Sequence, residues 1–197
     1  MELELLKDIN ARFNKELEQQ INGTLPKGHI YKLGVPEDIL GNYVYSSEIE
    51  LSATRLNEKS QYKRHVFELK EVLNLPQALS IPIAIFKYGD KNKALNIIIE
   101  LQKNDKNFLV GLSLNPTVKG RKLEIHSIRN VFPKDNAEWL NWIAQDKSIY
   151  LNKEKIQVQI SQQRMTSADV SYLNLELVAK LVKDFDNTKY MLDKMTI

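Results

Sequence analysis

The sequence of 197 residues has no cysteine, which excludes a disulfide framework, a Cys-based zinc site and cysteine chemistry of any kind. Its three histidines, His29, His65 and His126, are too far apart to show a metal-ligand spacing, so no metal and no other cofactor is expected. Glycine is also scarce, at seven residues, and the P-loop, GxGxxG, HExxH and GxSxG motifs are all missing. These absences argue against nucleotide-driven and metalloprotease chemistry.

Long apolar segments are lacking as well. The longest run, Ile81 to Phe86, contains Pro82 and is far too short to span a bilayer. The N-terminal MELELLKDIN is acidic and has no apolar core, so it does not resemble a secretory signal. We therefore expect no membrane association and a reducing, cytoplasmic compartment.

Positive charge is concentrated in one part of the chain, although the formal net charge of the whole is only +3. Residues 87–134 contain ten Lys and Arg against four Asp and Glu, a balance of +6, so the remainder carries −3. Two interpretations fit this segment: loops that lysine merely keeps solvated, or a surface that faces phosphate.

Helical periodicity marks both ends of the chain. Apolar residues recur every three or four positions over residues 1–22, which predicts an amphipathic helix that ends before Gly23 and Pro26. A second apolar series, after a cap at Ser167 or Asp169, predicts a C-terminal helix. The predicted organisation is therefore an N-terminal helical element (1–28), a central domain (29–164) and a C-terminal helix (165–197).

Four β-rich runs in the middle of the chain are separated by short polar loops, which suit hairpins and cannot hold a crossover helix. They predict a four-stranded antiparallel sheet with strands at 83–88, 94–102, 108–115 and 122–132. The fourth run mixes apolar and polar residues on each face, which suggests a β-bulge near Ser127. With helices expected before and after this sheet, the predicted fold class is α+β.

Six stretches of the central domain are distinctive in their order and spacing: HIYKLGVPEDIL (29–40), IELSATRLNEKS (49–60), LPQALSIPIAIFKY (75–88), IIIELQKNDKNFLVGLSLN (97–115), IHSIRNVFPKDNAEWLNWI (125–143) and YLNKEKIQVQISQQR (150–164). Together they resemble the phage MuF C-terminal domain family. That family belongs to the barnase–EndoU–colicin–RelE nuclease superfamily.

This resemblance implies a barnase/RelE-like core, in which helices pack on a four-stranded antiparallel sheet. It also implies metal-independent cleavage of RNA, in which the ribose 2′-OH attacks the adjacent phosphate, a base takes its proton and an acid protonates the leaving 5′-oxygen. Family members occur as toxin-like modules of phage head-morphogenesis proteins and of polyvalent proteins of mobile elements. RNA is therefore the expected substrate, and an immunity or phage protein is a further expected partner.

Three residues are the main candidates for such a site. His65 follows the basic run KRH, where the family often has a histidine, and its ordinary pKa of about 6.5 suits a general acid or base. Arg129 and Lys134 bracket the IRNVFPKD motif, and either could hold phosphate. The alternatives are a plain surface histidine for His65 and an ion pair of Arg129 with Glu100 or Glu124.

Further candidates complete the predicted site. Glu100 ends the apolar strand IIIE and, if buried, supplies a second proton-transfer group, with a structural ion pair as the alternative. Ser127 supplies a nearby hydroxyl. The remaining candidate phosphate ligands are Arg55, Lys59 and Lys87. We expect them on the same concave face, and the alternative is that they belong to a solvated surface.

Two residues depart from the family pattern, in which a small hydroxyl residue, valine or isoleucine, and tyrosine precede a GKD or PKD ending. Asn130 and Phe132 stand at the first and third of these positions. The leading hypothesis is an RNase-like toxin or polyvalent-protein domain. Its rivals are a module of the same fold that binds RNA, DNA or a protein without turnover, and a phage structural accessory whose outer helices pack on other chains.

Overall fold

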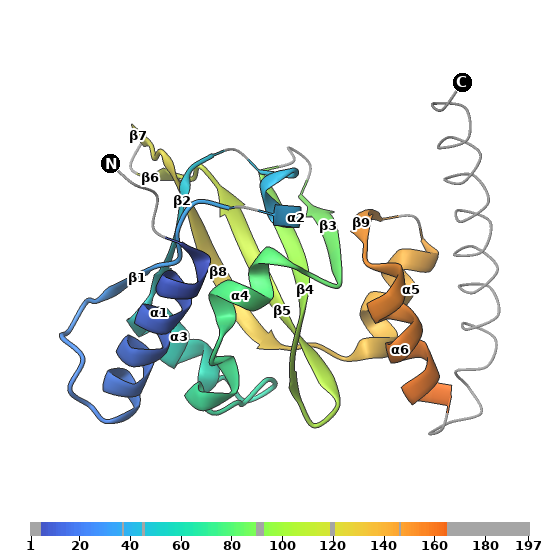
Figure 1. Cartoon of the computed structure of the whole chain (residues 1–197), viewed down its shortest axis with the longest axis horizontal. Helices are drawn as coiled ribbons and strands as arrows, with labels where there is room; N and C mark the ends of the chain where they lie inside the picture. Colours follow the sequence, from blue (N-terminus) through green and yellow to red (C-terminus); the bar gives the residue numbers. More distant parts are fainter. Residues whose placement is uncertain are drawn as a thin grey trace.

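The computed structural model describes residues 5–36, 38–44, 46–89, 93–118, 121–145 and 147–164. Within these residues the chain is a mixed α+β structure, as predicted, with an open β-sheet and helices on both of its faces (Figure 1). The predicted C-terminal helix at 165–197 lies outside the described residues. None of the helices in the described part has the length and apolar character that crossing a bilayer requires.

The β-sheet has seven strands in the order β1-β2-β8-β5-β4-β3-β9. The four expected strands are present and lie side by side in its middle, each antiparallel to the next. The predicted strand number is nevertheless wrong, because short segments extend the sheet at both sides and β2 joins β8 in parallel. The strands are β1 (Ile30–Lys32), β2 (Glu48–Ser52), β3 (Ala84–Tyr88), β4 (Ala94–Lys103), β5 (Lys106–Leu114), β8 (Ile125–Pro133) and β9 (Ser148–Leu151). A separate two-stranded ribbon consists of β6 (Thr117–Val118) and β7 (Arg121–Lys122).

The first face of the sheet is covered by the helices that precede β3. They are α1 (Leu6–Ile21), α2 (Asp38–Gly41), α3 (Ala53–Ser60), the 3₁₀-helix η1 (Leu69–Val72) and α4 (Leu75–Ser80). The predicted N-terminal helix is confirmed as α1. α3 begins after Ser52, because the Ser52 hydroxyl oxygen accepts a hydrogen bond from the Arg55 backbone N–H.

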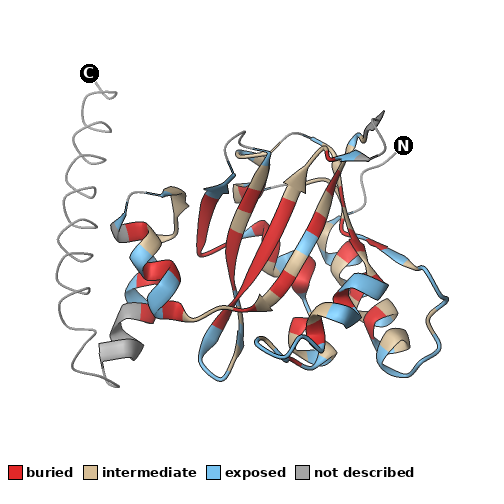
Figure 2. Ribbon diagram, turned by 180° about the vertical axis from the view of Figure 1, so that it is seen from behind, coloured by how far each residue is buried: buried red, intermediate tan, exposed pale blue. Residues whose placement is uncertain are grey.

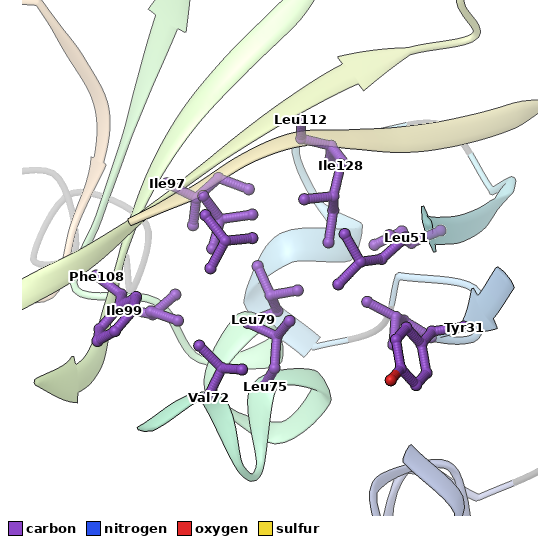
Figure 3. Packing of buried hydrophobic residues seen from close by; sticks show 14 of the residues in the cluster. Tyr31, Leu51, Val72, Leu75, Leu79, Ile97, Ile99, Phe108, Leu112 and Ile128 are labelled. Atoms are coloured by element: carbon purple, nitrogen blue, oxygen red, sulfur yellow. The ribbon is translucent and has the colours of Figure 1, made fainter. Parts of the chain in front are cut away.

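The main hydrophobic core lies between this face and these helices. On the strands, its fully buried side chains include Ile97, Leu112 and Ile128. Figure 3 shows the strand side chains directed toward α4, where Leu75 and Leu79 lie. Burying each such side chain stabilises the fold by about 1.5–3 kcal/mol relative to leaving it exposed. The core therefore determines which face of every strand is turned inward.

The second face of the sheet is covered only in part. α5 (Asn136–Ala144) and α6 (Lys153–Arg164) pack on its β3 side and form a second core with strand residues such as Ile98. The helix residues of this core are Trp139, Leu140, Ile143 and Ile156. Toward β8, no helix of the described residues crosses this face, and the strands are seen directly (Figure 2).

A β-bulge in β8 decides which of its side chains reach the second face. Consecutive residues of β5 pair with Asn130 and Ile128, so Arg129 between them has no partner in the register. Ile128 and Val131 are therefore both buried in the main core, although strict alternation would place them on opposite faces. The bulge lies just beyond Ser127, close to where the mixed faces of this strand predicted it.

A buried asparagine fastens α5 to the sheet. The Asn136 side-chain oxygen accepts hydrogen bonds from the Asn107 backbone N–H (3.0 Å) and from Trp139 Nε1 (2.9 Å). Its Nδ2 donates to the Asp105 carbonyl oxygen (2.8 Å) and to Gln159 Oε1 (3.2 Å). One side chain thus links the β4–β5 hairpin, α5 and α6, and holds the start of α5 beside the end of β8.

Candidate functional site

The uncovered part of the second face contains a hollow of about 250 Å³, here called the sheet hollow. Strand alternation assembles its lining, because residues two apart on a strand share a face. Its polar and aromatic lining residues are Tyr88 of β3, Asn96 of β4, Ser113 of β5, Arg129, Asn130 and Phe132 of β8, Lys134 before α5 and Trp142 on α5.

Gly111 forms the floor of the sheet hollow. In the register of the sheet it pairs with Asn96 on one side and with Asn130 on the other, so these residues lie side by side across three strands. A Cβ atom on Gly111 would lie 3.3 Å from both Cβ and Nδ2 of Asn130. Glycine therefore leaves room for the Asn130 amide, and a side chain at this position would intrude into the hollow.

A second hollow of about 280 Å³, here called the loop hollow, lies where the loop after α3 meets the β4–β5 hairpin and the start of α5. Its charged and titratable lining residues are Arg64, His65, Lys103, Lys106, Asp135 and Glu138. Lys106 pairs with Asp135 at 3.3 Å. Lys103 pairs with Glu71 at 3.3 Å. Arg64 has no carboxylate partner among the described residues, so the loop hollow keeps an unneutralised guanidinium.

The two hollows meet at Phe132 and Lys134. The His65 ring stacks on the Phe132 ring, with 4.4 Å between the ring centroids and 29° between the planes. Lys134 lines the sheet hollow, forms an ion pair with Glu138 of the loop hollow, and places its Nζ 5.2 Å from the centroid of the Trp142 ring. His65 is therefore held at the border of a hollow that carries positive charge.

Burial lowers the pKa of His65 below its ordinary value of 6.5, and the Lys134 ammonium lowers it further. Arg64 and Lys106 act in the same direction, whereas the Glu138 carboxylate opposes them. The imidazole is therefore mostly neutral at pH 7. In that state it has a ring nitrogen that can accept a proton.

Replacing Lys134 with methionine is expected to raise the pKa of His65, because the change removes a cation that disfavours the imidazolium ion. An NMR titration of the His65 ring measures the shift. Lys87→Met is the matched control, since it removes the same charge from an exposed lysine elsewhere on the sheet. An equal shift in both variants, or none in Lys134→Met, would contradict this account of the site.

The structure places Arg129 and Lys134 in the same hollow. Among the described residues, no carboxylate lies within ion-pairing distance of Arg129, so the alternative pairing with Glu100 or Glu124 is not formed. Ser127 is half-buried and is the cross-strand partner of Ser113, which lines the sheet hollow, but Ser127 itself lines neither the sheet hollow nor the loop hollow.

The expectation that Glu100 is buried is wrong. Its side chain is 59% exposed, and its carboxylate pairs with Lys155 Nζ of α6 at 2.7 Å. The pairing of β4 with β5 is irregular between Ile99 and Gln102, and Glu100 lies in this irregular part of the strand. The alternative reading of Glu100, a structural ion pair, is the arrangement observed, and we assign it no role in the site.

The predicted convergence of five cations on one concave face fails for three of them. Lys87 alternates along β3 with Tyr88, which lines the sheet hollow, so Lys87 is turned to the opposite face. Arg55 and Lys59 are on α3, whose buried Leu56 packs in the main core on the first face. Neither of these two residues lines the sheet hollow or the loop hollow.

Several lining residues were missed by the sequence argument. Asn96 interrupts the apolar run of β4, and this polar residue within a strand was a usable signal for a polar hollow. Glu138 follows Lys134 by one helical turn, which predicts an ion pair. For Tyr88, Ser113 and the basic loop residue Arg64, no local pattern indicated a shared site.

Within the described residues, no three or more His, Asp or Glu side chains are grouped so that they could hold a metal ion. The arrangement instead offers a neutral imidazole, cations and uncharged polar groups around one open face. Such a set can bind an anion and move a proton near it.

Comparison with known protein families matches residues 56–158 to the phage MuF C-terminal domain. No curated protein and no solved structure matched the chain. The matched segment covers just over half of the sequence and contains every residue that lines the sheet hollow and the loop hollow. The chain therefore belongs to the phage MuF C-terminal domain family.

Proposed function

We propose that this chain is a metal-independent endoribonuclease domain of phage or mobile-element origin, toxin-like in action and working on RNA in a cytoplasm. The family supports the phage origin. The observation that carries the enzymatic proposal is the position of His65, a neutral imidazole that stacks on Phe132 close to Lys134, one of the two cations of the sheet hollow. On the family resemblance alone, the proposal includes an immunity or phage protein as a second partner.

In the proposed reaction, His65 acts as the general base. It takes the proton of the ribose 2′-OH as the 2′-oxygen attacks the adjacent phosphorus. The bond from phosphorus to the 5′-oxygen then breaks, and that oxygen takes a proton from water, which reaches the open hollow. The products are a 2′,3′-cyclic phosphate end and a 5′-hydroxyl end, and His65 returns its proton to solvent.

Arg129 and Lys134 are the proposed phosphate ligands. The Arg129 guanidinium is exposed on the bulge of β8, has no carboxylate partner among the described residues, and has a planar fork that matches phosphate oxygens. The Lys134 side chain is only 14% exposed, so its charge acts in a partly dehydrated position. Cations in such places stabilise the extra negative charge that the phosphate gains during attack.

The placement of this family in the barnase–EndoU–colicin–RelE superfamily belongs to the same proposal. It is supported by the antiparallel order of β8, β5, β4 and β3 and by the helices packed on their first face. The sheet has additional strands at both sides, and its second face is partly covered by α5 and α6.

Incubation with total bacterial RNA in excess EDTA is the direct test of the proposal. We expect the full chain to cleave the RNA under these conditions, and end mapping to find 2′,3′-cyclic phosphates at the new 3′ ends. Cleavage that stops in EDTA and returns with Mg²⁺ would overturn the metal-independent mechanism. Absence of cleavage on every RNA tested would overturn the enzymatic proposal itself.

A second candidate, a non-catalytic RNA-binding module, is favoured by one observation. Asn130 and Phe132 occupy the positions where the family resemblance implies hydroxyl side chains, and both line the sheet hollow. This alternative predicts RNA affinity without cleavage. If Arg129 and Lys134 neutralise two phosphates, the logarithm of the affinity should fall with the logarithm of salt concentration with a slope of roughly −1.4.

A further inference from the structure

We infer that the sheet hollow is a binding site for a single unpaired nucleobase, whose attached phosphate lies against Arg129 and Lys134. This inference rests on the proposed function, because it assumes that RNA is the ligand. It adds a substrate class: the chain recognises single-stranded RNA and takes one base out of the strand into the hollow. Three separate properties of the hollow support it.

The first property is an unused hydrogen-bonding capacity. The side chains of Asn96, Ser113 and Asn130 line the hollow, and none of them has a hydrogen-bond partner among the described residues. Each asparagine amide offers two donors and an acceptor, and the serine hydroxyl offers one donor. Such groups match the edges of nucleobases, which present donors and acceptors side by side.

The second property is an aromatic rim. Tyr88 lines the hollow although it is 62% exposed, and Phe132 and Trp142 line it as well. Trp142 is held in place by an edge-on contact with Phe86, with 5.3 Å between the ring centroids. An exposed ring such as that of Tyr88 is a platform on which unpaired bases stack, whatever their sequence. A tyrosine left in water next to unpartnered amides is therefore best explained by a flat aromatic ligand.

The third property is size. The hollow measures about 250 Å³, which is below the roughly 300–1,000 Å³ of sites that enclose drug-sized ligands. One base fits these dimensions, whereas a double helix cannot enter a concave site and keeps its base edges within the stack. Arg129 and Lys134 lie on the lining itself, so a base in the hollow carries its phosphate to these two cations, of which Lys134 is close to His65.

The inference is tested with small probes that separate the base from the phosphate. The four nucleoside 3′-monophosphates and ribose 5-phosphate are titrated into the full chain, and NMR follows the side-chain amides of Asn96 and Asn130. We expect at least one mononucleotide to bind about tenfold or more tightly than ribose 5-phosphate, which is the effect of stacking one base. Its binding should shift both amide signals.

Two variants remove the base site in different ways. Gly111→Val fills the floor, because even a Cβ atom at this position would lie 3.3 Å from the Asn130 side chain, and Tyr88→Ala removes the exposed ring without touching the core. Both should abolish the preference for mononucleotides and leave the binding of ribose 5-phosphate unchanged. Val158→Ala, which shortens an exposed side chain of α6 outside the hollow, is the control and should keep the preference.

The outcomes separate this inference from the proposed function. Mononucleotides that bind no more tightly than ribose 5-phosphate, or a preference that survives in Tyr88→Ala, would overturn the base site even if the chain cleaves RNA. A preference that is lost in Tyr88→Ala supports the base site even if the chain cleaves no RNA. In that case only the enzymatic proposal fails. Because Tyr88 is exposed, this result stands even if Gly111→Val does not fold.

Discussion

Replacing His65 with alanine is expected to lower RNA cleavage by roughly two or more orders of magnitude, the usual contribution of a positioned general base. The reason is that no other described side chain with a pKa near neutrality lies at the border of the sheet hollow. Initial rates on total RNA in EDTA measure the effect. The melting temperature should change little, because His65 lies in a loop and is only half-buried.

Arg129→Ala should reduce cleavage to a similar extent, since a bulge presents this guanidinium to the hollow and no described carboxylate neutralises it. Glu100→Gln is the matched control. It breaks an exposed ion pair with Lys155, which is worth about 0–1 kcal/mol, and it should leave cleavage unchanged. Full activity in both His65→Ala and Arg129→Ala would remove this site from consideration.

The same mechanism has a defined pH dependence. A general base works in its deprotonated form, so cleavage should rise with pH through the pKa of His65 and then level off. Burial and Lys134 hold that pKa below its ordinary value, so most of the rise should lie below pH 7. A rate that falls over this range would instead indicate that His65 works as a general acid.

Replacing Asn136 with leucine is expected to cost about 3–5 kcal/mol of the free energy of unfolding. Asn136 is buried, and its loss leaves buried hydrogen-bonding groups of Asn107, Trp139 and Gln159 without their partner. Each orphaned buried group costs about 1–3 kcal/mol, and partial relaxation keeps the total below the sum. Urea unfolding followed by circular dichroism measures the change.

Asn141→Leu is the control for this prediction, because Asn141 is an exposed residue of the same helix and the substitution is identical. It should change the free energy of unfolding by less than about 0.5 kcal/mol. A loss of under about 1 kcal/mol in Asn136→Leu would show that the buried hydrogen bonds do not fasten α5. The border between the two hollows would then depend on the apolar packing of α5 through Trp139, Leu140 and Ile143.

Local sequence patterns determined most of the helices and the central strands. The apolar spacing in residues 1–22 predicted α1. Capping side chains within a few residues define two further helix starts: Ser52 accepts a hydrogen bond from the Arg55 backbone N–H at the start of α3, and Asp135 accepts one from the Ala137 backbone N–H at 3.0 Å at the start of α5. The four central strands were predicted because alternation and turn residues lie within a few positions of one another. The family resemblance and residue chemistry together predicted His65, Arg129 and Lys134 as residues of the site.

Only the tertiary structure decided how these parts combine. β1, β2 and β9 are short extended segments, and their places in the sheet are decided by the free edges of the meander, which offer them partners. The bulge at Arg129 changes which residues of β8 share a face. Glu100 is exposed because the register shifts beside it, although its neighbours read as a buried strand. Contacts between residues distant in sequence set the pairing partner, the register and the position of the bulge. The sequence by itself therefore identified candidate chemical groups, and the register of the sheet decided which of these groups share the sheet hollow.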